Sequence, residues 1–130
     1  MLADTVFLID LMENEPSAVK RATEIEGEGL TLYVGSPTIF ELYVGLSLSK
    51  SAEKERTKIM RILASLPQLP LDFESASSGG LIYGDKVKAG SKIDPEDAML
   101  AGIAKAHKET ILTRNIRHFE AIEGITIERY

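Results

Sequence analysis

No cysteine occurs at any of the 130 positions of this chain. Disulfide bonds and metal sites built from thiolates are therefore excluded, and the composition fits the reducing interior of a cell. The sequence also lacks any run of eighteen or more apolar residues, and its first residues show neither the basic region nor the cleavage site of a secretory signal. We therefore expect a soluble protein of the cytoplasm with no membrane partner.

A surplus of basic residues is absent as well. The formal net charge is −5, whereas proteins that bind nucleic acids by charge alone usually carry a basic stripe. The charge is nevertheless uneven, because residues 1–60 contain ten acids and six bases, while residues 86–117 contain four acids and seven bases. The second segment can form a local basic rim beside an acidic centre, or its basic side chains can simply be solvated on helix faces.

The apolar residues, 44% of the chain, are enough for one hydrophobic core, so we expect a single domain over residues 1–130. Short runs of β-forming residues alternate with longer segments of helical periodicity. Strands are predicted at residues 1–4, 30–35, 66–72, 110–113 and 125–130. Helices are predicted at residues 5–12, 16–26, 36–49, 51–66, 73–89, 95–107 and 116–121.

This alternation predicts an α/β fold, a three-layer sandwich in which helices cover both faces of a central, mostly parallel sheet. The segment 66–72 contains two prolines, so its strand should be short or lie at an edge. Gly79, Gly80 and Gly84 weaken the helix predicted at 73–89, and they do not match the spacing of a dinucleotide-binding loop. Close packing against a neighbouring helix is the better interpretation of these glycines.

Four oxygen-bearing side chains are predicted to meet at one end of the sheet. Asp4 ends the first strand, Glu41 and Asp97 fall in the first turns of the helices at 36–49 and 95–107, and Asn115 follows the strand at 110–113. In parallel α/β sheets, functional residues gather at the carboxyl ends of the strands. A shared site is therefore one interpretation of these four residues.

Helix capping is the competing interpretation. The spacing Thr38-x-x-Glu41 matches a capping box, and Asp94-x-x-Asp97 resembles one with Asp in place of Glu. The other two candidates can cap the helices that they precede. Taken singly, each residue fits capping as well as catalysis, but capping requires four separate coincidences.

A divalent cation is the partner that would suit clustered carboxylates. Their mutual repulsion raises their pKa values unless a cation neutralises them. An all-oxygen site favours Mg²⁺ or Mn²⁺ over zinc. His107 and His118 do not have the spacing of paired zinc ligands. We interpret His107 as an ordinary residue late in its helix and His118 as a rim or surface residue.

Four segments, in their order along the chain, carry a resemblance to a known family. They are "LADTVFLIDL", "SPTIFELYVGL", "IDPEDAMLAGIAKAH" and "ILTRNIRHFEAIEGITI". Together they resemble PIN-domain proteins, most specifically the VapC type of toxin ribonuclease from toxin–antitoxin pairs. No single segment is decisive, but their joint order and spacing span nearly the whole chain.

The resemblance implies a metal-dependent ribonuclease. It implies that Asp4, Glu41 and Asp97 bind Mg²⁺ or Mn²⁺, and that Asn115 takes a fourth position where relatives have Asp or Asn. It further implies that Thr113, together with Thr5, orders the site. Such a site hydrolyses RNA phosphodiester bonds by orienting the phosphate and activating a water molecule.

Partners follow from the same resemblance. It implies an RNA substrate, a cognate antitoxin along the active-site groove and a homodimer. Arg114 and Arg117, beside the fourth site position, can contact phosphate or can be an exposed pair. Two departures bear on activity: Val6 stands where relatives commonly have Asn or Ser, and His118 stands where many have an acid. A non-catalytic PIN-like module that binds RNA or an antitoxin is therefore the alternative function.

Three further acids receive structural interpretations. Asp94 is expected to be an N-cap, Glu96 to be a first-turn acid that points to solvent or to the residues around the metal ligands, and Asp10 to face water. A signalling domain phosphorylated on Asp is a second alternative, but it requires a late strand ending in Lys, and the strand at 110–113 is followed by Arg114.

Overall fold

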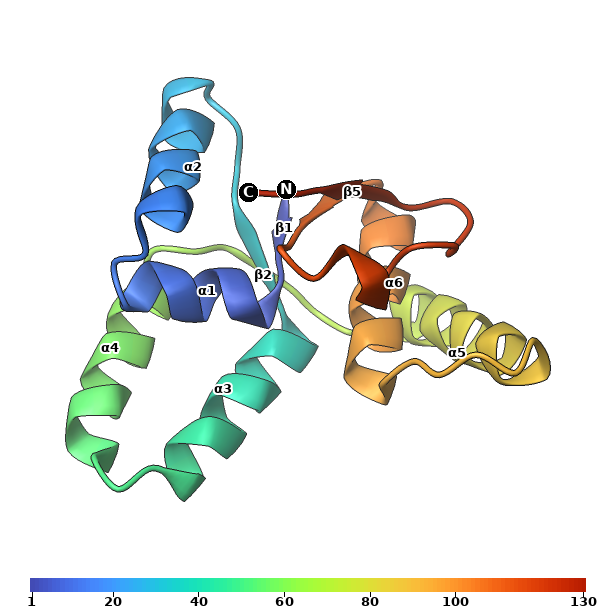
Figure 1. Cartoon of the computed structure of the whole chain (residues 1–130), viewed down its shortest axis with the longest axis horizontal. Coiled ribbons are helices and arrows are strands. Elements are labelled where there is room, and N and C mark those ends of the chain that lie inside the picture. Colours follow the sequence, from blue (N-terminus) through green and yellow to red (C-terminus); the bar gives the residue numbers. More distant parts are fainter.

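The computed structural model describes residues 1–130, and its strands and helices alternate along most of the chain (Figure 1). The strands are β1 (Leu2–Ala3), β2 (Tyr33–Gly35), β3 (Gln68–Leu69), β4 (Thr110–Leu112) and β5 (Thr126–Glu128). The helices are α1 (Thr5–Met12), α2 (Pro16–Gly27), α3 (Ser36–Leu48), α4 (Ala52–Ala64), α5 (Phe73–Lys88), α6 (Pro95–His107) and the short 3-10 helix η1 (Ile116–His118).

The five strands form one sheet in the order β3-β2-β1-β4-β5, and every neighbouring pair is parallel. The strand β1 is central, and the chain passes from it first to β2 on one side and later to β4 on the other. Ligands of open α/β sheets bind at such a reversal of strand order, outside the carboxyl ends of the strands. The predicted parallel sheet is confirmed, and β3 is the predicted short strand at an edge.

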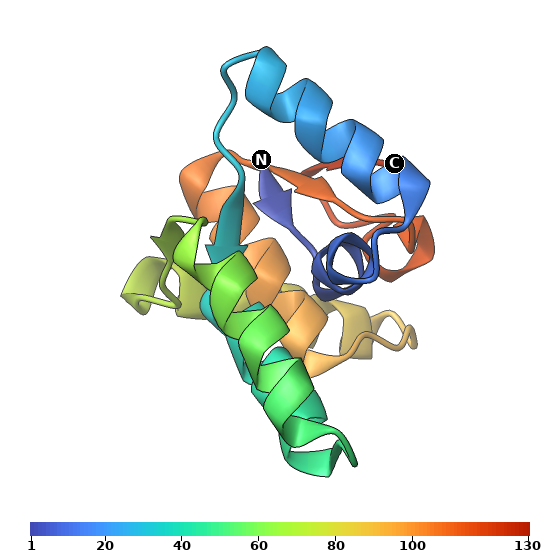
Figure 2. The same ribbon diagram turned by 90° about the vertical axis from the view of Figure 1, so that its left-hand side faces the viewer.

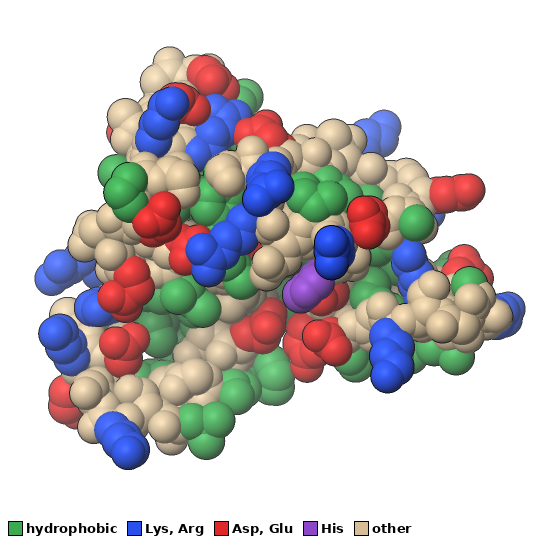
Figure 3. Space-filling model, viewed as in Figure 1, with side chains coloured by type: hydrophobic (Ala, Val, Ile, Leu, Met, Phe, Trp, Pro, Cys, Tyr) green, Lys and Arg blue, Asp and Glu red, His purple; other side chains and the backbone are tan.

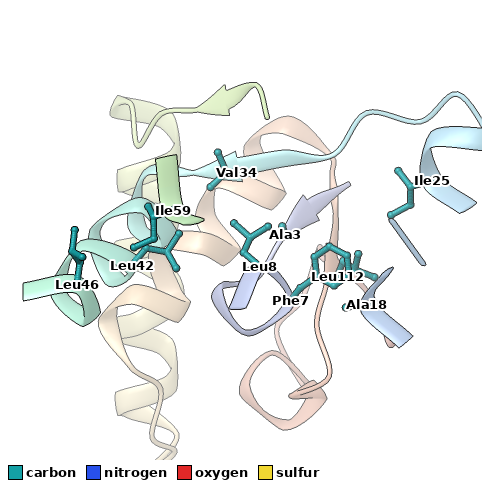
Figure 4. Packing of buried hydrophobic residues seen from close by; sticks show 10 residues of the cluster. All are labelled: Ala3, Phe7, Leu8, Ala18, Ile25, Val34, Leu42, Leu46, Ile59 and Leu112. Carbon is teal, nitrogen blue, oxygen red and sulfur yellow. The ribbon is translucent and has the colours of Figure 1, made fainter. Parts of the chain in front are cut away.

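Alternation along the strands divides the apolar residues between two cores. Leu2 and Ile111 pack on the face covered by α5 and α6. Ala3 and Leu112 pack on the opposite face, against the first four helices. Successive side chains of a strand point to opposite faces, so neighbouring residues of the same strand contribute to different cores. Figure 4 shows the second of these cores, with Phe7 and Leu8 at its centre.

The helices make the outer layers of the predicted three-layer sandwich. Figures 1 and 2 show α1 to α4 on one side of the strands and α5 and α6 on the other. The pair α5 and α6 packs at backbone distance, because a Cβ on Gly102 would lie 2.6 Å from the amide nitrogen of Gly79. Close packing, predicted for the glycines of α5, is confirmed at Gly79. Gly80 and Gly84, in contrast, have open space around them.

Two local predictions from the sequence are wrong. The helix α3 begins at Ser36 with Pro37 in its first turn, so Thr38 lies inside the helix and cannot be an N-cap. Glu41 accordingly lies in the second turn, and the predicted capping box does not form. The strand predicted at 30–35 is shorter, since only Tyr33–Gly35 pairs with neighbours. No helix of the structure is both long enough and apolar enough to cross a membrane.

Candidate active site

The four candidate residues all lie at the carboxyl-terminal edge of the sheet. Asp4 follows β1 and is 5% exposed, and its Oδ1 accepts a hydrogen bond of 2.7 Å from the amide of Thr5. It therefore caps α1 and also belongs to the candidate site. Asn115 follows β4, the direct neighbour of β1 in the sheet. Its side chain makes no capping hydrogen bond to η1, so capping does not explain Asn115.

A buried threonine links these two strand ends. Thr113 is fully buried, and its hydroxyl donates to Oδ2 of Asp4 at 2.7 Å. The same hydroxyl oxygen accepts a hydrogen bond of 2.9 Å from the amide of Asn115. Both carboxylate oxygens of Asp4 are thus engaged, and the loop that carries Asn115 is fixed to Asp4. Thr113, to which the resemblance assigns the ordering of the site, thus joins Asp4 to the loop that carries Asn115.

A second threonine links Asp4 to Glu41 of α3, the helix that follows β2. The hydroxyl of Thr5 donates to Oε1 of Glu41 at 2.7 Å, and the hydroxyl of Thr38 lies 3.3 Å from the same Thr5 oxygen. These contacts explain why Thr5 and Thr38 are buried although both are polar. Thr38 supports α1 from α3, which is a different role from the predicted cap.

Asp97 reaches the site from the first turn of α6. Its Oδ2 lies 3.1 Å from Nδ1 of His118, which makes an ion pair when the imidazole is protonated. Asp94 occupies the predicted N-cap position, but its side chain makes no capping hydrogen bond. First-turn acids suit the positive end of a helix dipole, and this effect accounts for Asp94 and Glu96 without a further role.

Burial raises the pKa values of all three acids, and repulsion from neighbouring acids adds to the shift for Glu41 and Asp97. Burial is the largest cause for Asp4, and the hydrogen bonds from Thr113 and Thr5 oppose it. Burial also raises the pKa of Glu41, and the negative charge of Asp4 adds to the effect. Burial raises the pKa of Asp97 to about 6, with His118 opposing and Asp4 and Glu41 reinforcing the shift. Glu41 and Asp97 therefore each feel the negative charge of another acid of the site.

The donor chemistry of this cluster fits a hard divalent cation. Its side chains offer only oxygen donors, which Mg²⁺ and Mn²⁺ prefer. No three His, Cys, Asp or Glu side chains are close enough to form a ready-made ligand set, and His118 and Thr5 each occupy a carboxylate oxygen. A cation would relieve the repulsion that raises the pKa values, so Asp4, Glu41 and Asp97 are the residues that fit it.

Figure 3 shows the surface around the cluster. Acidic side chains gather in the middle of this face, between α3 and α6 and beside a histidine, and basic side chains lie along the opposite side of the histidine. The residues 86–117 supply part of the predicted basic rim, because Arg114 and Arg117 are exposed. A surface of this kind suits a polyanion whose phosphate meets a cation held by the acids.

Comparison with known proteins decides the family. A model of the PIN domain matches residues 1–125. The chain belongs to the PIN-domain family. This PIN domain is 28% identical to the tRNA(fMet)-specific endonuclease VapC of Salmonella typhimurium, over 98% of this chain and 95% of that protein.

Solved structures agree with this assignment. The VapBC structure from Salmonella typhimurium, bound to DNA, has a TM-score of 0.87 at 27% identity and covers 98% of this chain and 96% of its counterpart. VapBC2 from Rickettsia felis, bound to a DNA fragment from its promoter, has a TM-score of 0.89 at 22% identity, with 99% and 97% covered. The predicted resemblance to VapC-type PIN domains and the predicted fold class are therefore confirmed.

One prediction about this PIN domain is wrong. Asp10 was expected to face water, but it is 7% exposed. Its Oδ2 accepts a hydrogen bond of 2.7 Å from the hydroxyl of Tyr130 and lies 3.1 Å from Nη1 of Arg114. The sequence does signal that Asp10 is paired, though not with which residues, since Asp10 is the only charged residue of the segment "TVFLIDLM", and a lone acid among apolar residues is usually paired when buried.

The two arginines predicted to contact phosphate differ in this PIN domain. Arg114 is tied to Asp10 and is 52% exposed, so it is not simply a free surface residue. Arg117 is exposed and forms no ion pair. Burial and the hydrogen bond to Asp10 raise the pKa of Tyr130, so its hydroxyl stays protonated and remains a donor.

Proposed function

We propose that this PIN domain is a divalent-metal-dependent endoribonuclease and the toxin of a VapBC-type toxin–antitoxin pair. The observation that carries the proposal is the gathering of Asp4, Glu41 and Asp97 from three separate elements, with all three pKa values raised. Carboxylates that repel one another in the free protein are poised to bind a cation. The ribonuclease names of the VapC relatives support the same class of reaction.

Each residue has a proposed role in hydrolysis. Asp4, Glu41 and Asp97 would hold Mg²⁺ or Mn²⁺, and Asn115 would add an amide oxygen beside them. When bound, such an ion orients the scissile phosphate, lowers the pKa of water and stabilises developing negative charge. Thr113 and Thr5 keep the carboxylates of Asp4 and Glu41 in place through their hydrogen bonds.

The substrate class is RNA, and tRNA is the first substrate to test. The Salmonella relative is named as an endonuclease specific for tRNA(fMet), which supports this choice. Exposed Arg114 and Arg117 lie next to Asn115 in the chain and suit phosphate contacts. We also propose a cytoplasmic location, where RNA is available and a chain without cysteine needs no oxidising compartment.

An antitoxin is the proposed regulatory partner. Its class is supported by the VapBC structure from Salmonella typhimurium and by a toxin–antitoxin complex from Klebsiella pneumoniae among the structural relatives. A homodimer is proposed as well, because large apolar side chains are exposed on α3 and α5, among them Leu48 at 80% and Phe73 at 90%. Exposed apolar surface of this kind commonly marks a protein interface.

RNA cleavage by Asp97→Asn tests the function. The wild type is expected to cleave tRNA with Mg²⁺ or Mn²⁺ and to lose activity in EDTA. Asp97→Asn should reduce the rate about a thousandfold, since several kcal/mol of transition-state stabilisation depend on the cation. The control, Asp94→Asn, changes an acid of the same helix start and should stay within a few-fold of wild type. Equal cleavage by wild type and Asp97→Asn would refute the proposed site.

The same assay separates the alternative, a PIN domain that binds RNA without cutting it. The observation that favours this alternative is His118, whose imidazole lies 3.1 Å from the carboxylate of Asp97. Binding of tRNA without cleavage at any Mn²⁺ concentration would establish the alternative. Cleavage that depends on Asp97 would exclude it.

A further inference from the structure

Asp10, Tyr130 and Arg114 form a corner of the molecule that the proposed hydrolysis leaves without a role. Asp10 belongs to α1, Tyr130 follows β5, and Arg114 lies in the loop between β4 and η1. A single oxygen of Asp10 receives the tyrosine hydroxyl at 2.7 Å and the arginine Nη1 at 3.1 Å. Three parts of the chain therefore meet at one carboxylate.

The two side chains of the ion pair between Asp10 and Arg114 differ in solvent exposure. The side chain of Asp10 is 10% exposed, whereas that of Arg114 is 52% exposed. A guanidinium has five N–H donors in a rigid plane, and Asp10 engages one of its nitrogens. Here the acid is covered and most of the guanidinium faces solvent.

The position of Arg114 in the chain connects it to the candidate active site. It stands between Thr113, whose hydroxyl donates to Asp4, and Asn115, whose amide donates to Thr113. The backbone of Arg114 is thus fixed from Asp4, and its side chain is fixed from Asp10. Tyr130 is itself held, because its ring packs edge-on against buried Phe7 with 4.8 Å between centroids.

From this geometry we infer that Asp10 and Tyr130 are positioning residues, which hold Arg114 so that its free N–H groups bind an RNA phosphate beside the carboxylate cluster. The inference rests on the proposed function and deepens it. An arginine that is already restrained loses less side-chain entropy when it binds, and a planar guanidinium matches phosphate geometry.

The opposite effect of Asp10 has to be considered. A carboxylate beside Arg114 also cancels part of its positive charge, and this cancellation alone would weaken attraction of a phosphate. If cancellation dominated, removing the charge of Asp10 would strengthen RNA binding. The positioning role predicts weaker binding, so the two effects differ in sign.

RNA affinity in EDTA, measured by fluorescence anisotropy with a short labelled single-stranded RNA, tests the inference without cleavage. Arg114→Gln should weaken binding about tenfold or more, the range of a hydrogen bond to a charged group. It should also reduce the salt slope by about one phosphate contact. Tyr130→Phe and Asp10→Asn should each weaken binding roughly three- to tenfold.

A double-mutant cycle distinguishes positioning from a general structural effect. In the Arg114→Gln background, Tyr130→Phe and Asp10→Asn should change affinity less than twofold, because the residue that they position is gone. Arg56→Gln is the charge-matched control, since Arg56 is exposed on α4 and has no ion pair, and it should stay within about twofold of wild type. Thermal melts confirm that each variant is folded, and Tyr130→Phe keeps the test available if Asp10→Asn unfolds.

Each contrary outcome overturns the inference. Tighter binding by Asp10→Asn would show that cancellation of charge dominates. Equal losses in the wild-type and Arg114→Gln backgrounds would show a structural effect only, and no measurable binding by wild type would remove the phosphate contact itself. Failure of the proposed function is a separate result, because it would appear as RNA binding by wild type without any metal-dependent cleavage.

Discussion

Asp4 and Asp10 are two buried acids at opposite ends of the same helix, and their surroundings differ in one respect. The carboxylate of Asp4 receives only neutral donors, the amide of Thr5 and the hydroxyl of Thr113. The carboxylate of Asp10 receives a neutral hydroxyl and also an arginine. A buried charge is costly unless it is paired. Asp10 is paired with a permanently charged arginine, whereas Asp4 and Glu41 receive only neutral donors and Asp97 has only the imidazole of His118 beside it.

This difference indicates where a ligand belongs. Capping explains one hydrogen bond of Asp4, but it does not explain why two further acids are brought near it. Such an accumulation destabilises the free protein and favours any cation that binds there. The acids of the candidate site destabilise the free protein, whereas the ion pair of Asp10 does not. This distribution is expected when only the candidate site binds a metal.

Replacing Asp4 or Asp10 by asparagine should give the largest difference in the rate of RNA cleavage. Asp4→Asn is expected to reduce RNA cleavage about a thousandfold, because a cation ligand is lost. Asp10→Asn should reduce it by roughly tenfold at most, through the position of Arg114. Rates of tRNA cleavage at saturating Mn²⁺ measure both. Similar losses in the two variants would abolish the distinction between them.

A divalent metal ion should remove the repulsion between the acids of the candidate site. At a hundred times its dissociation constant, Mg²⁺ or Mn²⁺ should stabilise the fold by about 2.7 kcal/mol, an increase in melting temperature of roughly 5–10 °C. Asp4→Asn and Asp97→Asn should lose most of this gain, and Asp10→Asn should keep it. An equal metal effect in all variants would place the cation elsewhere.

The pH dependence of stability should follow from the burial of Asp97, with repulsion from Asp4 and Glu41 adding to it. Burial raises the pKa of Asp97 from 3.8 to about 6, so the folded protein binds more protons than the unfolded chain between these values. The stabilising contribution is therefore complete below pH 3.8 and is lost as the pH rises through 6. Urea denaturation of the metal-free protein at pH 5 and pH 7.5 measures this loss. Between the two pH values, the wild type should lose more unfolding free energy than Asp97→Asn loses.

Removing the charge of Asp10 should lower the stability of the fold instead. Asp10→Asn breaks an ion pair whose acid is buried and whose arginine is half exposed, so we expect a loss of about 1–3 kcal/mol. Asp4→Asn should be neutral or stabilising without metal, since burial makes the carboxylate charge of Asp4 costly. Urea denaturation in EDTA compares the two, and a greater loss in Asp4→Asn would reverse the comparison.

Much of this arrangement was predictable from the sequence, and the exceptions have a physical reason. Pro16 and Pro95 mark the starts of two helices whose predicted bounds agree with the structure. The alternation of strands and helices predicts the parallel sheet and hence the edge where the candidate site lies. The capping box at Thr38 was wrong because Ser36 and Pro37 already begin the helix.

The role of Asp10 could not be predicted from local pattern. Its hydrogen-bond partner, Tyr130, is 120 residues away in the chain, and its ion-pair partner lies beyond β4. Periodicity describes one element at a time, so an acid in the second turn of a helix is read as solvent-facing. The same limit applies to the bond between Thr5 and Glu41, which joins α1 to α3.

The smallest expected effect comes from one hydroxyl group. Tyr130→Phe keeps the aromatic ring against Phe7 and removes the hydrogen bond to Asp10, so it should cost about 0.5–1.5 kcal/mol of stability. Asp10 then retains only Arg114. If the arginine is the main partner, Tyr130→Phe should cost less than Asp10→Asn, and the two changes should not add, because both act on the same contacting group. Tyr43→Phe, on the exposed side of α3, is the matched control and should leave the urea midpoint unchanged. A loss in Tyr130→Phe equal to that in Asp10→Asn would mean that the hydroxyl, not the cation, satisfies the buried acid, and the contrast between Asp4 and Asp10 would then no longer rest on charge.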